Sequence, residues 1–428
     1  MRKAVIIGGK KLKGKVRVSG SKNATLPILA ATILLRGETV IKNAPNLNDV
    51  TTMIRVLRAL GQRAEFHEPD TIKVSTGDKV KHVAPYELVT KMRASFFIIG
   101  PMLAKMGFAK VPLPGGCAIG SRPVDLHIRG LEALGAKVDM EHGFVIVKAN
   151  KLKGNRFYMD FPSVGATETV MMAAALAEGD TIIENAAREP EVADLANFLN
   201  QCGAKIQGVG EEAIRVEGVR ELKGVSYRVI PDRIEAATLI IAGAITHGEI
   251  SVEGIIEDHI KAVLMKLAEA GVEIRLEDNV AKVRVPDGIK PVDLITSPYP
   301  GFPTDVQPQF TTFMSLASGT SVVAETVFEN RFMHVQELKR MGADIKLEKQ
   351  SAIIKGVNKL SGCPVRVSDL RAGAALVLAG LVAEGETLID DTDRHIERGY
   401  ENLIEKLNSL GADLRELNGI SENGFGVK

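Results

Sequence analysis

The sequence lacks the features on which several large classes of protein depend. Its 428 residues contain three cysteines and no Cys-x-x-Cys pair, which argues against a disulfide framework or a zinc site and favours a reducing, cytoplasmic location. The formal net charge is +1, so we expect neither nucleic acid nor an acidic membrane surface as a partner. No apolar run approaches the roughly 18 residues that a membrane span needs.

The motifs of several cofactor-dependent enzymes are also missing. The segment from Gly9 to Lys15 begins like a phosphate-binding P-loop, but Val16 stands where the magnesium-binding Ser or Thr would be. No HExxH, Rossmann fingerprint or GxSxG motif is present. The sequence therefore predicts no metal site, no cofactor and no serine-hydrolase triad.

What the chain does contain is a sixfold repeat. A helical stretch that ends in Gly, usually followed by Ala, recurs about every 70 residues, and its glycines are Gly61, Gly135, Gly203, Gly271, Gly342 and Gly411. A second series keeps the same period, closes an Ala- and Leu-rich run and opens a strand-like run; its glycines are Gly37, Gly107, Gly179, Gly248, Gly319 and Gly385. Two markers with one period indicate six structural units, which divide naturally into two groups of three.

Each unit is expected to run helix, strand, loop, helix, strand. Its first helix, such as ATETVMMAAALA, is apolar on nearly every face and should be buried all round. Its strands, such as AKVRVPD, alternate apolar and polar residues and should have one face in water. The sequence therefore predicts the α/β class, with two inside-out α/β domains of three units each, buried helices and outward-facing sheets. A domain boundary is expected near residue 230.

The starts of the buried helices carry cations, although a positive charge there opposes the helix dipole. Four such residues are Lys22, Arg93, Arg233 and Arg371. An anionic ligand between the domains would explain them, and a set of structural ion pairs is the alternative. Polar residues at other helix starts are expected to be ordinary N-caps; these are Ser163, Asp232 and Ser368.

The second unit contains an insertion. Its two glycine markers, Gly107 and Gly135, lie 28 residues apart, against 23 or 24 residues in four other units. The surplus falls in a Gly- and Pro-rich loop of the kind that carries function or moves. The loop contains Cys117, with Arg122 five residues further on. A nearby cation makes a thiol more reactive, so Cys117 is either a reactive group or an inert loop cysteine.

Several segments of the chain resemble the enolpyruvyl transferases. They are SGSKNATLPILAA, PLPGGCAIGSRPVDLH, SVGATETVMMAAA, AREPEVADLANFL, YPGFPTDVQPQ, ETVFENRFMHVQEL, SDLRAGAALVLA and HIERGYENL. The segment around Lys22 (SGSKNA) and the loop around Cys117 are the most specific to the family. The resemblance implies transfer of the enolpyruvyl group of phosphoenolpyruvate to the 3-hydroxyl of UDP-N-acetylglucosamine, with release of phosphate, as the first committed step of peptidoglycan synthesis. It also implies one domain of residues 22–229 and a discontinuous second domain of residues 1–21 plus 230–428.

The same resemblance implies roles for individual residues. Cys117 would protonate the methylene carbon and form a phospholactoyl adduct, and Asp305 would be the base for the sugar hydroxyl. The cations expected to bind the phosphate and the carboxylate are Lys22, Arg122 and Arg398. The further substrate contacts that the resemblance implies are Asn23, Arg93, Pro123, Asp125, Leu126, His127, Ser163, Val164, Gly165, Val327 and Arg371.

Two other functions stay open at this point. One is enolpyruvyl transfer to shikimate phosphate, and the other is a catalytically silent repeat scaffold that binds a nucleotide sugar or a regulatory partner. The joint presence of Cys117, Lys22, Asp305 and Arg398 argues against silence. The sequence does not indicate an oligomeric state.

Overall fold

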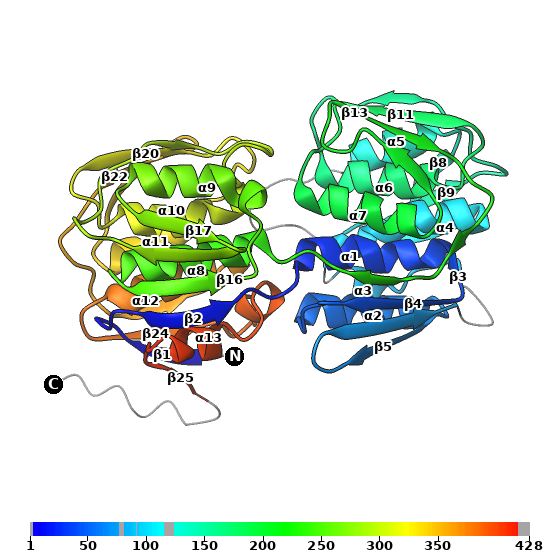
Figure 1. Cartoon of the computed structure of the whole chain (residues 1–428). Helices are drawn as coiled ribbons and strands as arrows, with labels where there is room; N and C mark the ends of the chain where they lie inside the picture. Colours follow the sequence, from blue (N-terminus) through cyan, green and yellow to red (C-terminus); the bar gives the residue numbers. More distant parts are fainter. Residues whose placement is uncertain (1–2, 77–80, 91, 115–123, 418–428) are drawn as a thin grey trace.

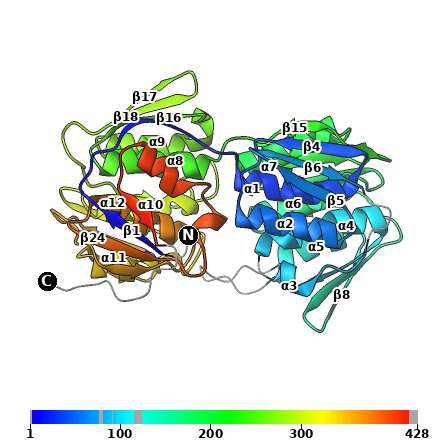
Figure 2. The ribbon, with the colours of Figure 1, turned by 90° about the horizontal axis from the view of Figure 1, so that it is seen from below.

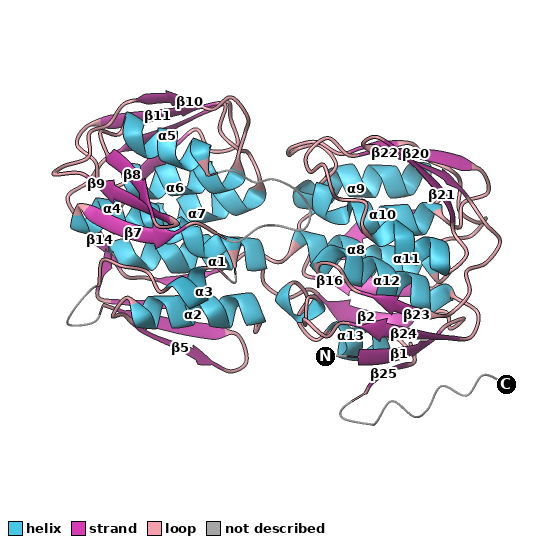
Figure 3. Ribbon diagram, turned by 180° about the vertical axis from the view of Figure 1, so that it is seen from behind, coloured by secondary structure: helices cyan, strands magenta, loops and turns pink. Residues whose placement is uncertain are grey.

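The computed structural model describes residues 3–76, 81–90, 92–114 and 124–417. Its elements form two bodies that lie side by side (Figure 1). We call them the first half, from α1 to β15, and the second half, which consists of β1, β2 and the elements from α8 onward. In both halves the helices lie in the middle and the strands on the outside (Figure 3). The inside-out α/β fold predicted from the sequence is confirmed.

Six central helices fill the two halves. They are α1 (Lys22–Ala31), α4 (Ile99–Met106), α6 (Val164–Ala174), α8 (Arg233–Ile245), α10 (Gln307–Met314) and α12 (Leu370–Val382). Short 3-10 helices accompany them, namely η1 (Thr32–Leu34), η2 (Arg93–Ile98), η3 (Thr304–Val306) and η4 (Ile396–Arg398). In α8 every residue after Arg233 is buried, as expected for a helix that is apolar all round.

The remaining helices are α2 (Asn48–Ala59), α3 (Tyr86–Val89), α5 (Asp125–Ala133), α7 (Pro190–Gln201), α9 (Glu257–Glu269), α11 (His334–Arg340) and α13 (Leu403–Ser409). The longer ones are amphipathic. In α9 the buried side chains are Ile260, Val263, Leu264 and Leu267, which is the spacing of one helix face. Among the described residues, no helix combines the length and the apolar character needed to cross a membrane.

Six amphipathic helices end in the same hydrogen-bonded turn. After α5 the Ala136 N–H donates to Leu131 O at 3.0 Å, and the Gly135 N–H donates to Glu132 O at 2.8 Å. The same pair of bonds follows α2, α7, α9, α11 and α13, and it constitutes the Schellman motif. Gly135 has a φ of +90°, and the other five marker glycines have φ between +90° and +105°. The first repeat marker is therefore a backbone requirement, because a Cβ is disfavoured at such angles.

The strands of the first half are β3 (Leu35–Arg36), β4 (Glu38–Lys42), β5 (Arg63–His67), β6 (Thr71–Ser75), β7 (Phe108–Pro112), β8 (Lys137–Glu141), β9 (Phe144–Lys148), β10 (Arg156–Tyr158), β11 (Asp180–Glu184), β12 (Lys205–Gln207), β13 (Ala213–Glu217), β14 (Leu222–Lys223) and β15 (Ser226–Arg228). They form sheets in the orders β15-β4-β6-β5, β7-β9-β8 and β10-β11-β13-β12, with a small β14-β3 pair.

The strands of the second half are β1 (Lys3–Ile7), β2 (Lys13–Arg17), β16 (Glu249–Glu253), β17 (Glu273–Glu277), β18 (Val280–Arg284), β19 (Leu294–Ile295), β20 (Thr320–Ala324), β21 (Asp344–Glu348), β22 (Ser351–Lys355), β23 (Pro364–Arg366), β24 (Glu386–Asp390) and β25 (Leu414–Glu416). Their sheets have the orders β17-β18-β16-β2, β19-β20-β22-β21 and β23-β24-β1-β25.

The predicted order of elements within a unit was incomplete. The third unit runs β10, α6, β11, α7, β12, β13, where β10 pairs in parallel with β11 and the β12–β13 pair is antiparallel. The expectation lacked the strand before the buried helix and one strand of this pair. Both β10 and β12 have three residues, which is too short for alternation to distinguish a strand from a loop.

The chain crosses between the halves twice, and the two crossing segments are hydrogen-bonded to each other. The Ser21 N–H donates to Ile230 O and the Asp232 N–H donates to Ser19 O, both at 2.8 Å. Figure 2 shows the N-terminal segment passing from β2 into α1. As a result β1 pairs with β24 and β25, and β2 pairs with β16, all in the second half.

Each half has its own hydrophobic core. One cluster of buried residues runs from Ala24 to Val229, and the other combines Ala4 to Val18 with Ile234 to Leu414. The apolar residues of each half therefore pack among themselves.

The turn at Gly135 gives a prediction about stability. A Cβ on Gly135 would meet no atom within 4 Å, so Gly135→Ala should suffer backbone strain alone and lose about 1 kcal/mol of unfolding free energy. Gly135→Asn should lose less, because Asn tolerates positive φ better. Urea unfolding followed by circular dichroism measures both. Equal stability of Gly135→Ala and the wild type would contradict the assignment of the repeat marker to backbone strain.

Candidate active site

The starts of the central helices α1, α8 and α12 meet the 3-10 helix η3 between the two halves. The Lys22 N–H at the start of α1 donates to Asp232 Oδ2 at 3.2 Å, and Asp232 also caps α8. Arg371 in the first turn of α12 reaches Asp305 of η3 at 2.9 Å. Burial lowers the pKa of Lys22, and the charges of Asp305, Arg371 and other neighbours act on it as well. The first turns of α1, α8, η3 and α12 thus share one charged region.

The helix caps agree only in part with the sequence analysis. Ser163 Oγ accepts the Ala166 N–H at 3.4 Å, and Asp232 caps α8, as predicted. The prediction for Ser368 was wrong. Asp369 is the cap and accepts the N–H groups of Arg371 and Ala372 at 2.9 and 3.1 Å. The helix begins one residue later than expected, and a carboxylate is a strong acceptor for its first N–H groups.

Asp49 joins two of the candidate cations. It lies in the first turn of α2, and its side chain is 6% exposed. Its Oδ2 accepts from Lys22 Nζ at 3.2 Å and its Oδ1 accepts from Arg398 Nε at 2.8 Å. Burial alone would raise the pKa of Asp49, but Lys22 and Arg398 bring it below its ordinary value. The sequence analysis missed Asp49, because neither a repeat marker nor a motif singles it out.

Asp305 is held by two buried arginines. Its Oδ1 is 2.9 Å from Arg331 Nη2, and its Oδ2 is 2.9 Å from Arg371 Nη2. The arginine side chains are 2% and 1% exposed, whereas that of Asp305 is 28% exposed. Burial opposes ionisation of Asp305, yet Arg371 and Arg331 lower its pKa far below the ordinary range. Asp305 lies within η3, whose N-cap residue is Pro303, and among the described residues its side chain makes no helix-capping bond. Arg331 was also missed by the sequence analysis.

These contacts show which carboxylates balance the positive charges at the helix starts. Arg371 and Lys22 each have a carboxylate partner, and Arg233 Nε is 2.9 Å from Glu191 Oε1. The alternative of structural ion pairs is therefore present in the structure. Compensation is incomplete, however, because Asp49 and Asp305 are each divided between two cations. A region in which cations share carboxylates retains attraction for an anion.

A second group of candidates lies where α5, α6 and η2 meet. His127 is buried, and its Nδ1 is 2.9 Å from Thr169 Oγ1. Burial, together with the charge of Arg93, lowers the pKa of His127 to about 3. A Cβ on Gly165 would lie 2.9 Å from Phe97 Cε1 and 3.1 Å from His127 Cε1. The start of α6 is therefore packed closely against α5, and His127 is neutral at physiological pH.

A buried carboxyl group lies behind this second group. Glu168, in α6, is fully buried, and neither of its carboxyl oxygens has a hydrogen-bond partner within the described part of the chain. Burial and the charges of Glu191 and Glu189 raise its pKa well above the ordinary value. Glu191 in turn pairs with Arg233 of the second half. Glu191 therefore acts on the pKa of Glu168 in α6 and also forms an ion pair between the halves.

The other predicted site residues occupy the edges of these groups. Asn23 is half-buried in the first turn of α1, and Asp125 and Leu126 lie in the first turn of α5, exposed and half-buried respectively. Val164 is half-buried at the start of α6, and the Val327 N–H donates to Glu325 Oε1 at 2.9 Å. Cys117, Arg122 and Pro123 lie outside the described residues.

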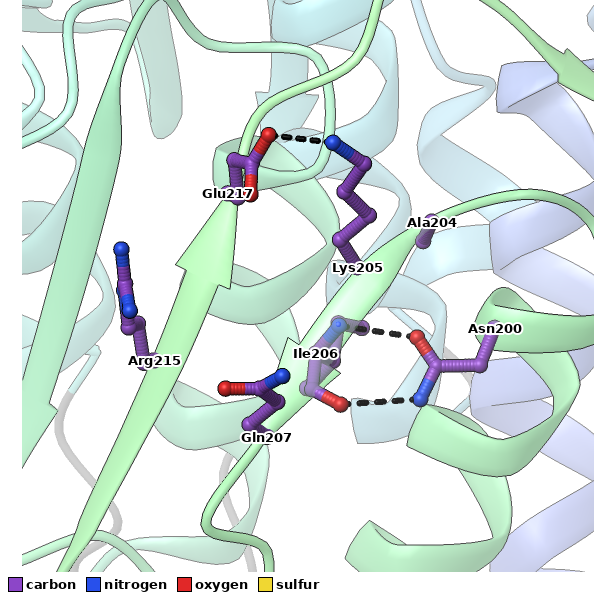
Figure 4. Close-up of a pocket in the computed structure, with 7 residues that line it drawn as sticks. All are labelled: Asn200, Ala204, Lys205, Ile206, Gln207, Arg215 and Glu217. Carbon is purple, nitrogen blue, oxygen red and sulfur yellow. Dashed lines mark hydrogen bonds and ion pairs between the residues drawn. The ribbon is translucent and has the colours of Figure 1, made fainter.

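One cavity of the described residues lies outside this region. Its volume is about 300 Å³, and it is lined by Asn200, Ala204, Lys205, Ile206, Gln207, Arg215 and Glu217 (Figure 4). Lys205 pairs with Glu217, and the Asn200 side chain holds both backbone groups of Ile206. Arg215 pairs with Asp180 outside the lining, and none of the predicted site residues borders this cavity.

The described residues offer little for metal or disulfide chemistry. They contain no group of three or more His, Cys, Asp or Glu side chains that could hold a metal ion. Cys202 is buried and Cys363 is partly buried, and both are free thiols. Burial raises the pKa of Cys202 to about 12 and also raises that of Cys363, so both thiols are weak nucleophiles at neutral pH.

The sequence is similar to a known family over most of its length. Residues 6–407 match the family of EPSP synthase (3-phosphoshikimate 1-carboxyvinyltransferase). UDP-N-acetylglucosamine 1-carboxyvinyltransferase 1 of Caldanaerobacter subterraneus is 54% identical over 404 residues, covering 94% of this chain and 96% of the relative. UDP-N-acetylglucosamine 1-carboxyvinyltransferase 2 of Carboxydothermus hydrogenoformans is 54% identical over 420 residues, covering 97% and 100%.

Solved structures of similar fold are also enolpyruvyl transferases. The enolpyruvyl transferase NikO of Streptomyces tendae superposes with a TM-score of 0.86 at 25% identity, over 96% of this chain and 98% of that one. EPSP synthase of Acinetobacter baumannii superposes with a TM-score of 0.75 at 19% identity, over 97% and 99%. The second likeness concerns the fold alone.

The arginine pair around Asp305 gives a prediction about stability and pH. Arg331→Met should cost about 2 kcal/mol of unfolding free energy, less than the 3–5 kcal/mol of a fully buried broken pair, because Asp305 is partly exposed and keeps Arg371. The folded pKa of Asp305 is depressed, so its stabilising effect is present above the unfolded pKa of about 3.9 and is lost as the pH falls. The deficit should be constant from about pH 6 to 8 and should shrink below about pH 4.

Urea unfolding at several pH values measures this deficit. Arg340→Met is the control, because Arg340 is an exposed partner of Glu337 and should change stability by less than about 0.5 kcal/mol. A deficit of Arg331→Met that matches this control at pH 7 would contradict the prediction.

Proposed function

Because the chain belongs to the family of UDP-N-acetylglucosamine 1-carboxyvinyltransferases, which are enolpyruvyl transferases, we propose that it transfers the enolpyruvyl group of phosphoenolpyruvate to the 3-hydroxyl of UDP-N-acetylglucosamine. The products are inorganic phosphate and the enolpyruvyl ether of the nucleotide sugar, and the ether is used in peptidoglycan synthesis. The observation that supports this most directly is the charged region between the halves, where Asp49 and Asp305 are each shared by two cations.

The proposed reaction is an addition followed by an elimination. In the addition, the sugar oxygen bonds to C2 of phosphoenolpyruvate while C3 gains a proton, which gives a tetrahedral ketal. In the elimination, C3 loses a proton and the bond from C2 to the phosphate oxygen breaks. No oxidant or metal is needed for this balance. The protein must hold two anionic groups, provide an acid and a base, and exclude water.

We assign the anionic groups of phosphoenolpyruvate to Lys22, Arg122 and Arg398. Lys22 and Arg398 come from different halves and lie on either side of Asp49. The Arg398 side chain is 31% exposed, so a ligand can reach it. Donors fixed in place before the reaction stabilise developing charge without having to reorganise. Asn23, next to Lys22 in α1, would hydrogen-bond the intermediate.

We assign Asp305 as the base for the sugar hydroxyl. Its low pKa ensures that the carboxylate is ionised at neutral pH but makes it a weak proton acceptor. A ligand anion that draws Arg331 or Arg371 away would raise its basicity. Arg371 and Arg331 therefore act on the base as well as on the ligand. Cys117 is proposed as the acid for C3 and as the nucleophile of a phospholactoyl adduct.

The nucleotide sugar is proposed to lie along the second group of residues and toward Asp305. The first turns of α5 and α6 and the start of η2 would contact it, through Arg93, Pro123, Asp125, Leu126, His127, Ser163, Val164 and Gly165. Helix N-termini supply N–H groups and a positive dipole end, which suit a diphosphate. Val327 would border the sugar. Neutral His127 would act as a hydrogen-bonding group.

We propose that residues 22–229 act as one domain and residues 1–21 plus 230–428 as the other. The two separate hydrophobic cores and the two crossing segments support this division. We also propose a cytoplasmic location, which the free thiols of Cys202 and Cys363 support.

Phosphate release tests the proposed reaction. The protein is incubated with phosphoenolpyruvate and either UDP-N-acetylglucosamine or shikimate 3-phosphate, and inorganic phosphate is measured over time. Release should depend on UDP-N-acetylglucosamine. Release with shikimate 3-phosphate alone would show the other branch of the family, and binding of the nucleotide sugar without any release would show a silent scaffold.

The thiol chemistry gives a second prediction. A thiol-directed epoxide such as fosfomycin should label Cys117 and inactivate the enzyme at neutral pH. It should leave Cys202 unlabelled, because burial raises the pKa of that thiol to about 12. Cys117→Asp keeps a short acidic side chain and should retain turnover, whereas Cys117→Ala should lose nearly all of it. Mass spectrometry of the treated protein locates the adduct. Labelling of Cys202 or Cys363 with Cys117 unlabelled would remove Cys117 from the mechanism.

A further inference from the structure

Asp49 links the two halves at the point where the candidate cations meet. Lys22 belongs to the first half and Arg398 to the second, and both bond to the Asp49 carboxylate, at 3.2 and 2.8 Å. Neighbouring contacts place α2 against the η4 segment. The Asn46 N–H donates to Glu401 Oε1 at 2.6 Å, and Asn48 Nδ2 donates to Glu397 Oε2 at 3.1 Å. The carboxylate is thus fixed in a contact made by several groups.

This contact differs from a simple salt bridge in that one carboxylate has two cationic partners. Two cations that share one nearly buried carboxylate repel each other, and a single negative charge neutralises the two positive charges only in part. The phosphate and the carboxylate of phosphoenolpyruvate are negatively charged, as Asp49 is. An internal carboxylate between the cations therefore holds them where a substrate anion would need them.

We propose that Asp49 is a positioning residue of the enolpyruvyl transfer, which keeps the Lys22 ammonium charged and aligned with the Arg398 guanidinium. The inference rests on the proposed function. Asp49 touches the two cations and acts on the substrate through them. Its effect is expected on turnover more than on substrate affinity, because its own negative charge opposes a bound anion while its hydrogen bonds hold the donors in place.

The electrostatic surroundings of Lys22 give this inference a distinctive readout. Burial lowers the pKa of Lys22, Asp49 raises it, Arg371 and Arg398 lower it, and Asp305 raises it. These groups come from α2, α12, η4 and η3, the elements whose charges reach the Lys22 side chain. Removal of the Asp49 charge leaves burial and two cations opposed by Asp305 alone. The Lys22 pKa should then fall further, and the ammonium should lose its proton at lower pH.

Asp49→Asn tests the inference, because it keeps the shape of the side chain and removes its charge. We expect kcat at about pH 8 to fall roughly 100-fold while KM for phosphoenolpyruvate does not rise. The alkaline limb of the kcat profile should move down by about one pH unit, the effect of losing one adjacent opposite charge. Asp49→Glu should restore the position of the limb and part of kcat.

Asp194→Asn is the matched control. Asp194 is a buried aspartate of α7 that accepts the Tyr227 hydroxyl at 2.6 Å, and no substrate role is assigned to it. Its replacement should lower stability and leave the alkaline limb in place. If Asp49→Asn also leaves the limb in place, or lowers kcat only in proportion to lost folded protein, the positioning role is overturned.

A second measurement separates this inference from the proposed function. Calorimetric titration with inorganic phosphate from about pH 6.5 to 9.5 follows anion binding without turnover, and Asp49→Asn should lose phosphate binding at lower pH than the wild type. Wild-type protein that releases no phosphate from phosphoenolpyruvate and UDP-N-acetylglucosamine would refute the proposed function. An identical pH dependence of phosphate binding in wild type and Asp49→Asn would refute the role of Asp49.

Discussion

Burial of the six central helices over most of their length is the constraint on which the rest of this structure depends. A helix that is apolar on every face must be surrounded by protein, so the sheets take the outer positions. In open α/β sheets, ligands bind at the carboxyl ends of central strands. Here the strands are peripheral, and the central elements bring their helix N-termini together between the halves instead. The starts of α1, α8, η3 and α12 consequently form the charged region between the halves, and helix N-termini are suited to anions.

Burial of the helix starts also creates an electrostatic problem that the protein solves with few carboxylates. Lys22, Arg331, Arg371 and Arg398 are compensated by Asp49 and Asp305. Burying ion pairs is a poor way to gain stability, because desolvation offsets much of the attraction. The arrangement is better explained by ligand binding, since cations that share a carboxylate can accept a further anion. The low pKa of Asp305 follows from the same arrangement.

The sequence predicted what depends on local pattern and missed what depends on distant contacts. The glycine markers identified the units because Gly135 and its five counterparts need a positive φ for the Schellman turn. Continuous apolar helices predicted the inside-out layers. Three-residue strands such as β10 and β12 were not predicted, because they are too short to show an alternation of apolar and polar residues. Asp49 and Arg331 escaped for another reason: their partners lie 349 and 26 residues away, at Arg398 and Asp305, and no local pattern encodes such a pairing.

The same contacts relate the chemistry of the site to the relative position of the halves. The crossing segments are hydrogen-bonded to each other through Ser21 and Asp232, and Asp49 and Glu191 make further contacts between the halves. Both contacts join one half to an arginine of the other, Arg398 and Arg233. Of these groups, Asp49 and Arg398 also act on the pKa of Lys22, Asp49 by raising it and Arg398 by lowering it. An anion that binds these cations would act on Lys22 as well, so anion binding and the ionisation of Lys22 are coupled.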